Sequence, residues 1–386
     1  MRYITATQIF SGIEYLPSDT LLVVNDNGFI EDITVKENIK SNTIEHFEGI
    51  ICPGFVNTHC HLELSHLNNI IKQHIGIVDF GLGVMKHRND FSIEIQEEAM
   101  HLADKEMQKQ GIIAVGDISN TNSSIKAKLQ SDLYYHTFVE LIALNPERAD
   151  LVFESGKKLL NEYISHNLSA SIAPHAPYST SRELIKKITD NCHQLNKPSS
   201  IHNQESQAEN EFFNFKTGAY LSLYETINVS IDYFKASGKS SLQTIVSSFN
   251  NNVNTLLVHN TFSSKNDIDS ALKQHQHLFW CLCPNANLYI ENTLPDINLL
   301  VSNSCKLTIG TDSLASNSQL SLIGEINTIL KHQPNTSLEV LLNAATYNGA
   351  KFLGIENQFG LLEKGKKCGI NLIEGKTKNY SVRKLA

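Results

Sequence analysis

Two histidines separated by one residue lie in the segment PGFVNTHCH at residues 53–61. The Pro-Gly pair indicates a turn, and the apolar residues after it predict a buried strand. Side chains alternate across a strand, so His59 and His61 point to the same side and can bind one divalent cation. The same spacing recurs at residues 275–277, and the chain has 16 histidines. The pair alone therefore does not establish a metal site.

Four further polar residues follow apolar runs directly. The runs SIAPHAPYS, SSIHNQES, TLLVHNTF and LTIGTDS place His175, His202, His259 and Asp312 just after predicted strands. Each residue taken singly is as readily a hydrogen-bonded core residue as a ligand. The carboxyl ends of parallel strands meet at one rim of a barrel, so their convergence predicts a shared site. The remaining histidines are interpreted as ordinary residues of helices and loops.

The elements that would position these residues follow a regular alternation. Apolar, β-rich runs alternate with helical stretches at 50–58, 112–119, 133–143, 168–174, 198–202, 254–259, 277–283 and 305–311. Eight such units predict an α/β fold, a (β/α)8 TIM barrel, with room for extra helices within 206–250. Short strand-like runs before residue 50 and near 360–373 predict a small β-sandwich unit built from both termini. The expected domains are 1–50 with 353–386, and a barrel over 51–352.

Composition narrows the class of protein. Hydrophobic residues make up 41% of the chain and charged residues 19%, which is typical of a soluble globular protein. The net charge of −8 argues against nucleic acid as a partner, and no apolar run is long enough to span a membrane. Seven scattered cysteines and the lack of a secretory signal predict reduced thiols and a cytoplasmic location. Cys281 and Cys283 have the spacing of half a zinc site but lie in an apolar run, which favours packing.

Taken together, the motifs resemble those of a known enzyme superfamily. The segments PGFVNTHCHLE, SIHNQES, LLVHN, CPNAN and LTIGTDSLASN resemble the amidohydrolase superfamily, in its cytosine-, guanine- and adenosine-type deaminase and chlorohydrolase branch. The HLELS continuation at 61–65 is similar to aminodeoxyfutalosine deaminases and to related chlorohydrolase-like members. The elements GKKCGINLI and CPNANL depart from the usual family pattern, and the second of these bears on substrate contacts.

The resemblance implies a hydrolase of carbon–nitrogen bonds. Its reaction would be deamination of an aminated heterocycle, a purine nucleoside-like compound of the aminodeoxyfutalosine, adenosine or guanine type. The alternative is a triazine-type chlorohydrolase or amine hydrolase, or a cyclic amidohydrolase. A small-molecule substrate is expected in either case, and a homodimer is left open by the size of the barrel.

The resemblance also implies a set of metal ligands. His59, His61, His202 and Asp312 would hold one divalent ion, with zinc expected first and iron or manganese as alternatives. Binuclear members of the superfamily bridge two ions with a carboxylated lysine in the fourth strand. Residues 168–174 contain no lysine, so a single ion is expected.

Catalytic roles follow from the same resemblance. Asp312 would accept a proton from a metal-activated water, and Glu205 would protonate the substrate ring and the leaving amine. His259 would stabilise the developing negative charge or orient the water, and His175 would reach the substrate. Glu205 has a second interpretation as a carboxylate at a helix N-terminus.

Arginine content gives one expectation about the substrate. The chain has five arginines, of which Arg88 follows the first predicted barrel strand and Arg148 the third. Arginine grips a carboxylate through two parallel hydrogen bonds, although each of these residues is as readily a solvated surface residue. With the HLELS similarity, the pair predicts a substrate carboxylate remote from the reacting amine.

Overall fold

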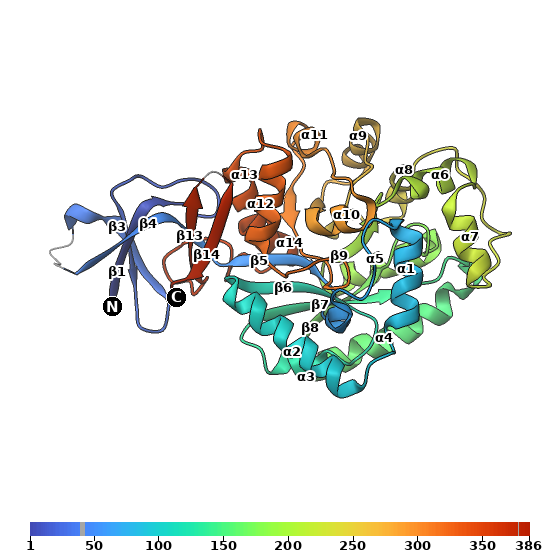
Figure 1. The fold of residues 1–386 in the computed structure, drawn as a ribbon, viewed down its shortest axis with the longest axis horizontal. Helices are drawn as coiled ribbons and strands as arrows, with labels where there is room; N and C mark the ends of the chain where they lie inside the picture. Colours follow the sequence, from blue (N-terminus) through green and yellow to red (C-terminus); the bar gives the residue numbers. More distant parts are fainter. Residues whose placement is uncertain (39–42, 377) are drawn as a thin grey trace.

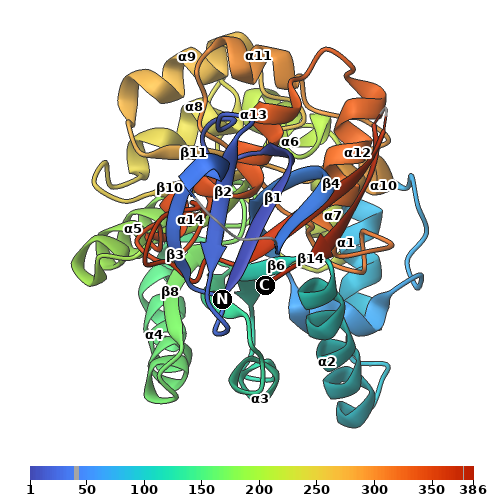
Figure 2. The same ribbon diagram turned by 90° about the vertical axis from the view of Figure 1, so that its left-hand side faces the viewer.

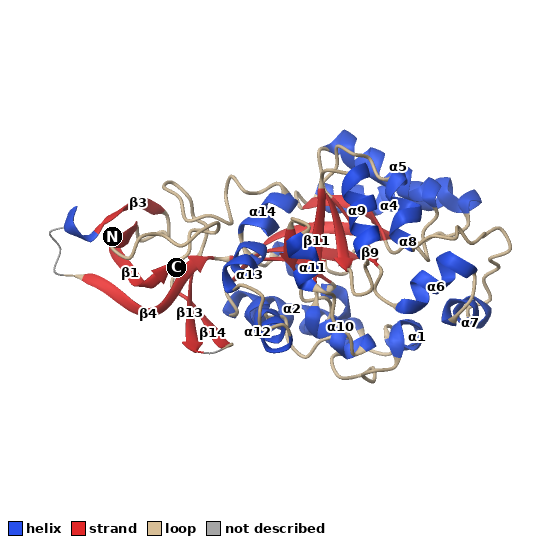
Figure 3. Cartoon of the chain, turned by 90° about the horizontal axis from the view of Figure 1, so that it is seen from above, coloured by secondary structure: helices blue, strands red, loops and turns tan. Residues whose placement is uncertain are grey.

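The computed structural model describes residues 1–38, 43–376 and 378–386. A small sheet at one end adjoins a barrel that is surrounded by helices (Figures 1 and 3). The barrel strands are β5 (Phe55–Cys60), β6 (Ile112–Ser119), β7 (Tyr134–Leu141), β8 (Ser169–Pro174), β9 (Ser199–Asn203), β10 (Thr255–His259), β11 (Leu278–Leu282) and β12 (Leu307–Ile309).

These strands run parallel in two groups of four. The pairing orders are β5-β6-β7-β8 and β12-β11-β10-β9. Backbone contacts join the groups on both sides: the amides of Thr311 and Asp312 donate to His59 O, each at 3.0 Å, and His202 N donates to His175 O at 2.9 Å. The predicted (β/α)8 barrel is confirmed. Both junctions lie at residues that the sequence singles out for chemistry.

Helices separate and cover the strands. They are α1 (Gly76–His87), α2 (Ile93–Lys109), α3 (Ile125–Leu129), α4 (Ala149–Ser165), α5 (Arg182–Leu195), α6 (Gln207–Phe215), α7 (Ala219–Thr226), α8 (Ser241–Ile245), α9 (Lys265–Gln274), α10 (Pro284–Glu291), α11 (Ile297–Ser302), α12 (Leu322–His332), α13 (Leu338–Ala345) and α14 (Tyr347–Leu353). The stretch 206–250 holds the extra helices α6, α7 and α8. No helix within the described ranges has the length and apolarity needed to cross a bilayer.

Helix α5 shows how local sequence sets these elements. The Ser181 hydroxyl accepts a hydrogen bond from Leu184 N at 3.3 Å and so caps the first turn. Leu184, Ile188 and Cys192 recur at helical spacing and are fully buried. Asn196 ends the helix in the left-handed conformation, which asparagine tolerates.

The two ends of the chain share one six-stranded sheet. Its order is β14-β13-β4-β1-β2-β3, built from β1 (Arg2–Ile9), β2 (Thr20–Val24), β3 (Ile30–Val35), β4 (Ile44–Pro53), β13 (Ile370–Lys376) and β14 (Asn379–Lys384). Figure 2 shows this sheet in front of the barrel, with the two termini close together. The Arg2 guanidinium donates to Leu385 O at 2.8 Å, which ties the two ends of the chain. The exact domain boundaries stay a prediction.

The first barrel strand begins later than the sequence predicts. The expected strand 50–58 is divided: residues 50–53 end β4 in the small sheet, and β5 starts at Phe55. Gly54 between them packs so closely that a Cβ there would lie 2.5 Å from the Ile113 side chain and 2.9 Å from Cys368 O. The chain passes from one sheet to the other at this contact. β5 then runs away from the small sheet, so its carboxyl end lies at the far end of the barrel (Figure 1).

Candidate active site

Four predicted ligands lie together at the carboxyl ends of the strands. His59 Nε2 and His61 Nε2 are 3.1 Å apart, and His202 Nε2 is 3.4 Å from His61 Nε2. Asp312 Oδ1 lies 3.5 Å from His59 Nε2 and 3.3 Å from His61 Nε2. Bonds of about 2.1 Å arranged tetrahedrally place neighbouring ligand atoms about 3.4 Å apart. The spacing of these atoms therefore suits one ion of the size of zinc.

The hydrogen bonds around these ligands also fit a cation. His202 Nδ1 donates to His175 O at 2.8 Å, which leaves an unprotonated Nε2 directed at His61 Nε2. The lone pair of His202 Nε2 is thereby available to a cation between the two rings. Asp312 Oδ2 accepts a hydrogen bond from Ser316 Oγ at 2.6 Å, which fixes the carboxylate with Oδ1 toward the histidines.

Burial and neighbouring charges favour the protonation states that a metal requires. Burial, followed by the adjacent histidines, holds the pKa of His202 well below its usual range. Burial lowers the pKa of His61 as well. For Asp312 burial opposes ionisation, but hydrogen bonding to His59 and the nearby imidazoles outweigh it, and its pKa lies well below the usual value. Neutral imidazoles and an ionised carboxylate are the forms that bind divalent ions.

Three residues at this rim adopt a left-handed backbone conformation. The φ angles of Gln204, His259 and Asp312 are 45°, 76° and 57°, in the left-handed region that non-glycine residues rarely adopt. Each of these residues lies just beyond the end of a barrel strand or at its last position. Such strain clusters at functional sites, because the surrounding structure must hold it in place.

Glu205 and His259 form a pair beside the ligands. His259 Nε2 lies 3.4 Å from Glu205 Oε1, and both side chains are almost fully buried. The Asn287 amide is 3.2 Å from His259 Nδ1 and acts as the donor there, so the imidazole proton is on Nε2, facing Glu205. Burial lowers the pKa of His259 to about 3, and burial with the charge of Asp312 raises the pKa of Glu205 well above its usual range. Burial thus favours the neutral forms of the imidazole and of the carboxyl group that faces it.

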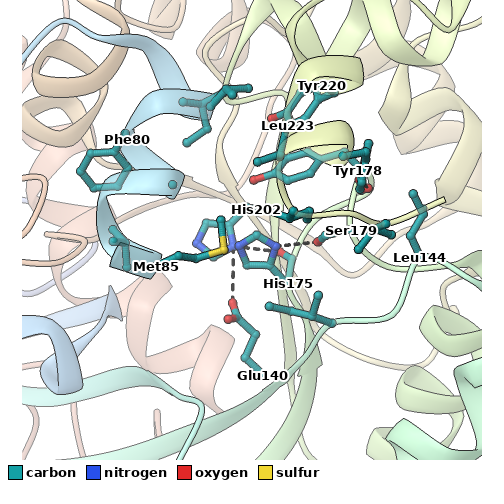
Figure 4. Close-up of a pocket in the computed structure, with 18 of the residues that line it drawn as sticks. Phe80, Met85, Glu140, Leu144, His175, Tyr178, Ser179, His202, Tyr220 and Leu223 are labelled. Atoms are coloured by element: carbon teal, nitrogen blue, oxygen red, sulfur yellow. Dashed lines mark hydrogen bonds and ion pairs between the residues drawn. The ribbon is translucent and has the colours of Figure 1, made fainter. Parts of the chain in front are cut away.

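A cavity of about 630 Å³ opens onto these groups. Its walls are mainly apolar and aromatic, with Phe80, Met85, Leu144, Tyr178, Tyr220 and Leu223 around the ligands (Figure 4). This size and lining are typical of a site for a small organic molecule. His175 lines the cavity, and its Nδ1 is 2.6 Å from Ser179 Oγ.

Both arginines chosen from the sequence line the same cavity. Arg88 follows the last residue of α1, and Arg148 directly precedes α4. In the parts of the chain that the structure describes, neither guanidinium has a carboxylate partner. Two cationic groups without a carboxylate partner therefore border a cavity whose walls are mainly apolar.

Three residues of the site, Asn287, Ser316 and Glu140, were not predicted from the sequence. Asn287 lies within the CPNAN segment without an assigned role, and Ser316 follows Asp312 by four residues. Glu140 is the second-last residue of β7 and lines the cavity next to His202 (Figure 4). Its signal was available, since a charged residue inside an apolar barrel strand is unusual.

The second His-x-His pair is not a metal site. His275 Nε2 donates to Asn250 O at 3.1 Å, and its Nδ1 accepts from His277 N at 3.1 Å. Both nitrogens of His275 are therefore engaged. His136, interpreted from the sequence as a helix or loop residue, lies buried on β7.

The cysteines behave as packing residues. Cys281 Sγ and Cys283 Sγ are 3.8 Å apart, and all seven cysteines are buried with free thiols. The interpretation of Cys281 and Cys283 as core residues is consistent with this burial.

Comparison with known proteins gives the family. A model of the amidohydrolase family matches residues 50–385, which is most of the chain. The chain belongs to the amidohydrolase family. This amidohydrolase is 27% identical over 358 residues to an aminodeoxyfutalosine deaminase from a Nitratiruptor species, covering 89% of this chain and 85% of the relative.

Two Helicobacter pylori proteins extend the comparison. An adenosine deaminase is 27% identical over 391 residues, covering 94% of this chain and 91% of the relative. The crystal structure of an aminofutalosine deaminase with methylthio-coformycin superposes with a TM-score of 0.80 at 24% identity, covering 98% of this chain and 94% of the other. That structural likeness shows that the amidohydrolase fold extends over almost the whole chain.

Proposed function

We propose that this amidohydrolase is a metal-dependent deaminase that hydrolyses the amino group from the purine ring of a nucleoside-like substrate, of the aminodeoxyfutalosine or adenosine type. The pairing of a buried Glu205 with His259 beside the candidate ligands carries the proposal. A leaving amine must be protonated, and Glu205 is the carboxyl group poised to do so. The names of the two relatives that are 27% identical support the same reaction.

Three histidines and one aspartate would hold the ion. These are His59, His61, His202 and Asp312, and zinc is proposed because three imidazoles and one carboxylate suit it. When bound, a divalent ion supplies a Lewis acid that lowers the pKa of a coordinated water toward neutrality. A single ion is proposed, because β8 offers no lysine, and Lys128 is already paired with Asp117 Oδ2 at 2.7 Å.

The side chains of the chain divide the proton transfers. Asp312 accepts the proton of the attacking water, since Ser316 holds its Oδ2 and leaves Oδ1 near the histidines. Glu205 gives its proton to the ring nitrogen, and its carboxylate then takes the remaining proton of the added water and passes it to the leaving amine, while the proton held by Asp312 restores Glu205. His259 directs its Nε2–H into the same space and stabilises the negative charge that develops there. The surrounding apolar walls exclude water and strengthen each of these interactions.

The outer cavity suggests the rest of the substrate. Arg88 and Arg148 would bind a carboxylate remote from the reacting amine, and the apolar walls, which include Tyr178, would contact the part of the substrate between the two ends. His175 would contact the substrate rather than the ion, because its Nδ1 is engaged with Ser179. The cytoplasmic location and the homodimeric state stay predictions.

A screen of substrates tests the proposal. Purified protein loaded with zinc is supplied with aminodeoxyfutalosine, adenosine, guanine and a chlorotriazine, and both ammonia and chloride release are measured. The proposal expects ammonia release from at least one purine compound and none after the metal is removed by a chelator. Chloride release from the triazine, with no ammonia from any purine, would refute it.

A further inference from the structure

Glu140 presents a buried acceptor that lacks a donor. The residue is 9% exposed at the end of β7, and its Oε2 accepts a hydrogen bond from Asn120 Nδ2 at 2.9 Å. Its Oε1 is buried and has no hydrogen-bond partner among the described residues. His202 Nδ1 lies 3.7 Å from it, but the proton of that nitrogen is already donated to His175 O. A buried acceptor without a donor is costly, and such cases point to a missing ligand.

A chain of hydrogen bonds fixes this carboxylate. Glu63, just beyond the His59–His61 pair, accepts hydrogen bonds from the backbone amide of Asn120 at 3.0 Å and from Thr121 Oγ1 at 2.9 Å. Asn120 in turn donates its side-chain amide to Glu140. The first and third strands of the barrel are thereby linked through the residue that follows β6. Glu140 Oε1 is held at the cavity wall without a cation to neutralise it.

Glu140 lies in the same cavity as the candidate metal ligands and the two arginines. The metal-facing nitrogens lie on one side of the His202 imidazole, and Glu140 lies near the opposite nitrogen of the same ring. Arg88 and Arg148 line the same cavity. Glu140 borders this cavity as well, so it is available to the middle portion of a substrate whose amine lies at the metal ligands and whose acid lies at the arginines. In a nucleoside-like molecule that portion is the sugar.

We propose that Glu140 Oε1 accepts a hydrogen bond from a hydroxyl group of the substrate's sugar, so that the site selects nucleosides over free bases. This inference rests on the proposed deamination of a purine nucleoside-like compound. Carboxylates are common acceptors for ribose hydroxyls in nucleotide sites, because one oxygen can bind a hydroxyl while the other stays anchored. Here Oε2 is anchored by Asn120, and Oε1 is the acceptor left for the hydroxyl.

Glu140 does not form a second metal site with its neighbours. Glu140, His175 and His202 are close enough to suggest a cation. However, His202 Nδ1 donates its proton to His175 O at 2.8 Å and has no lone pair to offer. His175 Nδ1 is engaged with Ser179 Oγ at 2.6 Å. A hydroxyl donor satisfies Glu140 Oε1 without disturbing either bond.

The test compares sugar hydroxyls across variants. Values of kcat/KM are measured for adenosine, 2′-deoxyadenosine, 3′-deoxyadenosine and adenine with the zinc-loaded wild-type protein, Glu140→Gln and Glu147→Gln. Glu147 is an exposed glutamate in the loop after β7 and provides the same change of charge outside the cavity. Metal content and thermal unfolding are recorded for each protein.

The expected pattern is specific to a hydroxyl contact. The wild-type protein should lose about 10- to 100-fold on removal of one of the two hydroxyls, the scale of a hydrogen bond to a charged group. Glu140→Gln should lose a similar factor on adenosine and little on the matching deoxynucleoside or on adenine, with its zinc content unchanged. Glu147→Gln should behave as the wild type.

Three results would overturn the inference. Deamination of all four compounds by the wild type without discrimination would refute it while leaving the proposed function intact. An equal loss on every substrate in Glu140→Gln, or loss of zinc, would assign Glu140 to the support of His202 instead. Failure of the wild type on every purine compound tested, aminodeoxyfutalosine included, would remove the proposed function and this inference together.

Discussion

A buried ion pair beneath the candidate metal ligands gives a strong test of the structure. Lys128 Nζ on α3 lies 2.7 Å from Asp117 Oδ2 on β6, and neither side chain is exposed to solvent. The ammonium also donates to Thr137 Oγ1 at 2.9 Å and to Ser119 Oγ at 3.0 Å. Asp117 Oδ1 accepts from the amide of Leu62, next to His61, at 2.8 Å. The pair thus ties the helix to the segment that carries two of the ligands.

Lys128→Met should destabilise the protein strongly. Methionine retains much of the apolar stem but removes the charge, which leaves the Asp117 carboxylate buried without a cation. Loss of one partner of a buried pair costs about 3–5 kcal/mol in the free energy of unfolding. Urea titration of the metal-free protein measures this difference directly.

The same helix provides a matched control. Lys126 Nζ lies 2.6 Å from Glu97 Oε2, but the two side chains are 64% and 40% exposed. Solvent screens such a pair, so Lys126→Met should cost less than about 1 kcal/mol. The double variant Lys128→Met with Asp117→Asn should recover part of the loss, because no charge stays buried. Equal effects of the two lysine substitutions, or a cost below about 1 kcal/mol at Lys128, would refute the reasoning.

Four further predictions concern the site and its surroundings. Asp312→Asn should abolish turnover while some metal is retained, since an amide oxygen can ligate but cannot take the water's proton. Glu205→Gln should lower kcat by about 10²–10⁴-fold, the usual effect of losing a general acid–base group. Arg88→Met or Arg148→Met should lower kcat/KM for a carboxylate-bearing substrate by a factor that corresponds to about 2–3 kcal/mol of lost transition-state stabilisation. The same substitutions should hardly change kcat/KM for adenosine. Stability should fall as the pH drops from about 6.5 toward 3, because buried His136 has a pKa lowered to about 3 and an unfolded histidine binds a proton near 6.5.

Each of these predictions has a result that contradicts it. Near-normal activity of Asp312→Asn would remove that residue from the mechanism, and an effect of Glu205→Gln on KM alone would indicate a binding role. Equal losses on both substrates, or none, would dismiss the arginines as carboxylate ligands. His136→Gln should reduce the slope of the unfolding free energy against pH by about 1.4 kcal/mol per pH unit between pH 3 and 6.5, because one proton fewer is taken up on unfolding. An unchanged slope would place the titration elsewhere.

The barrel could be predicted because its strands are buried on both faces. Such strands appear as continuous apolar runs, and His202, His259 and Asp312 stand out where the runs end. The Pro53-Gly54 pair indicates a turn, but apolar residues continue on both sides of it, so the sequence does not show that residues 50–53 belong to the other sheet. What separates the two sheets is the close packing of Gly54 against Ile113, a contact between distant strands.

The residues that hydrogen-bond to the site residues also could not be predicted, because their roles depend on contacts that the sequence does not show. Asn287 and Ser316 act through hydrogen bonds to His259 and Asp312, and these depend on the paths of α10 and of the turn after β12 rather than on a pattern in the sequence. Glu140 depends on Asn120 across two strands. Placement of both predicted arginines on the cavity wall followed from the rule that loops after barrel strands reach one rim.

Metal-dependent ammonia release tests the central claim most directly. Chelator-treated protein is titrated with zinc while ammonia release from aminodeoxyfutalosine and from adenosine is followed, and bound zinc is measured at each step. The account predicts no release without zinc and activity that rises linearly to a plateau at about one zinc per chain. Full activity in the metal-free protein, or bound zinc at the four ligands with no ammonia released from either nucleoside, would contradict it.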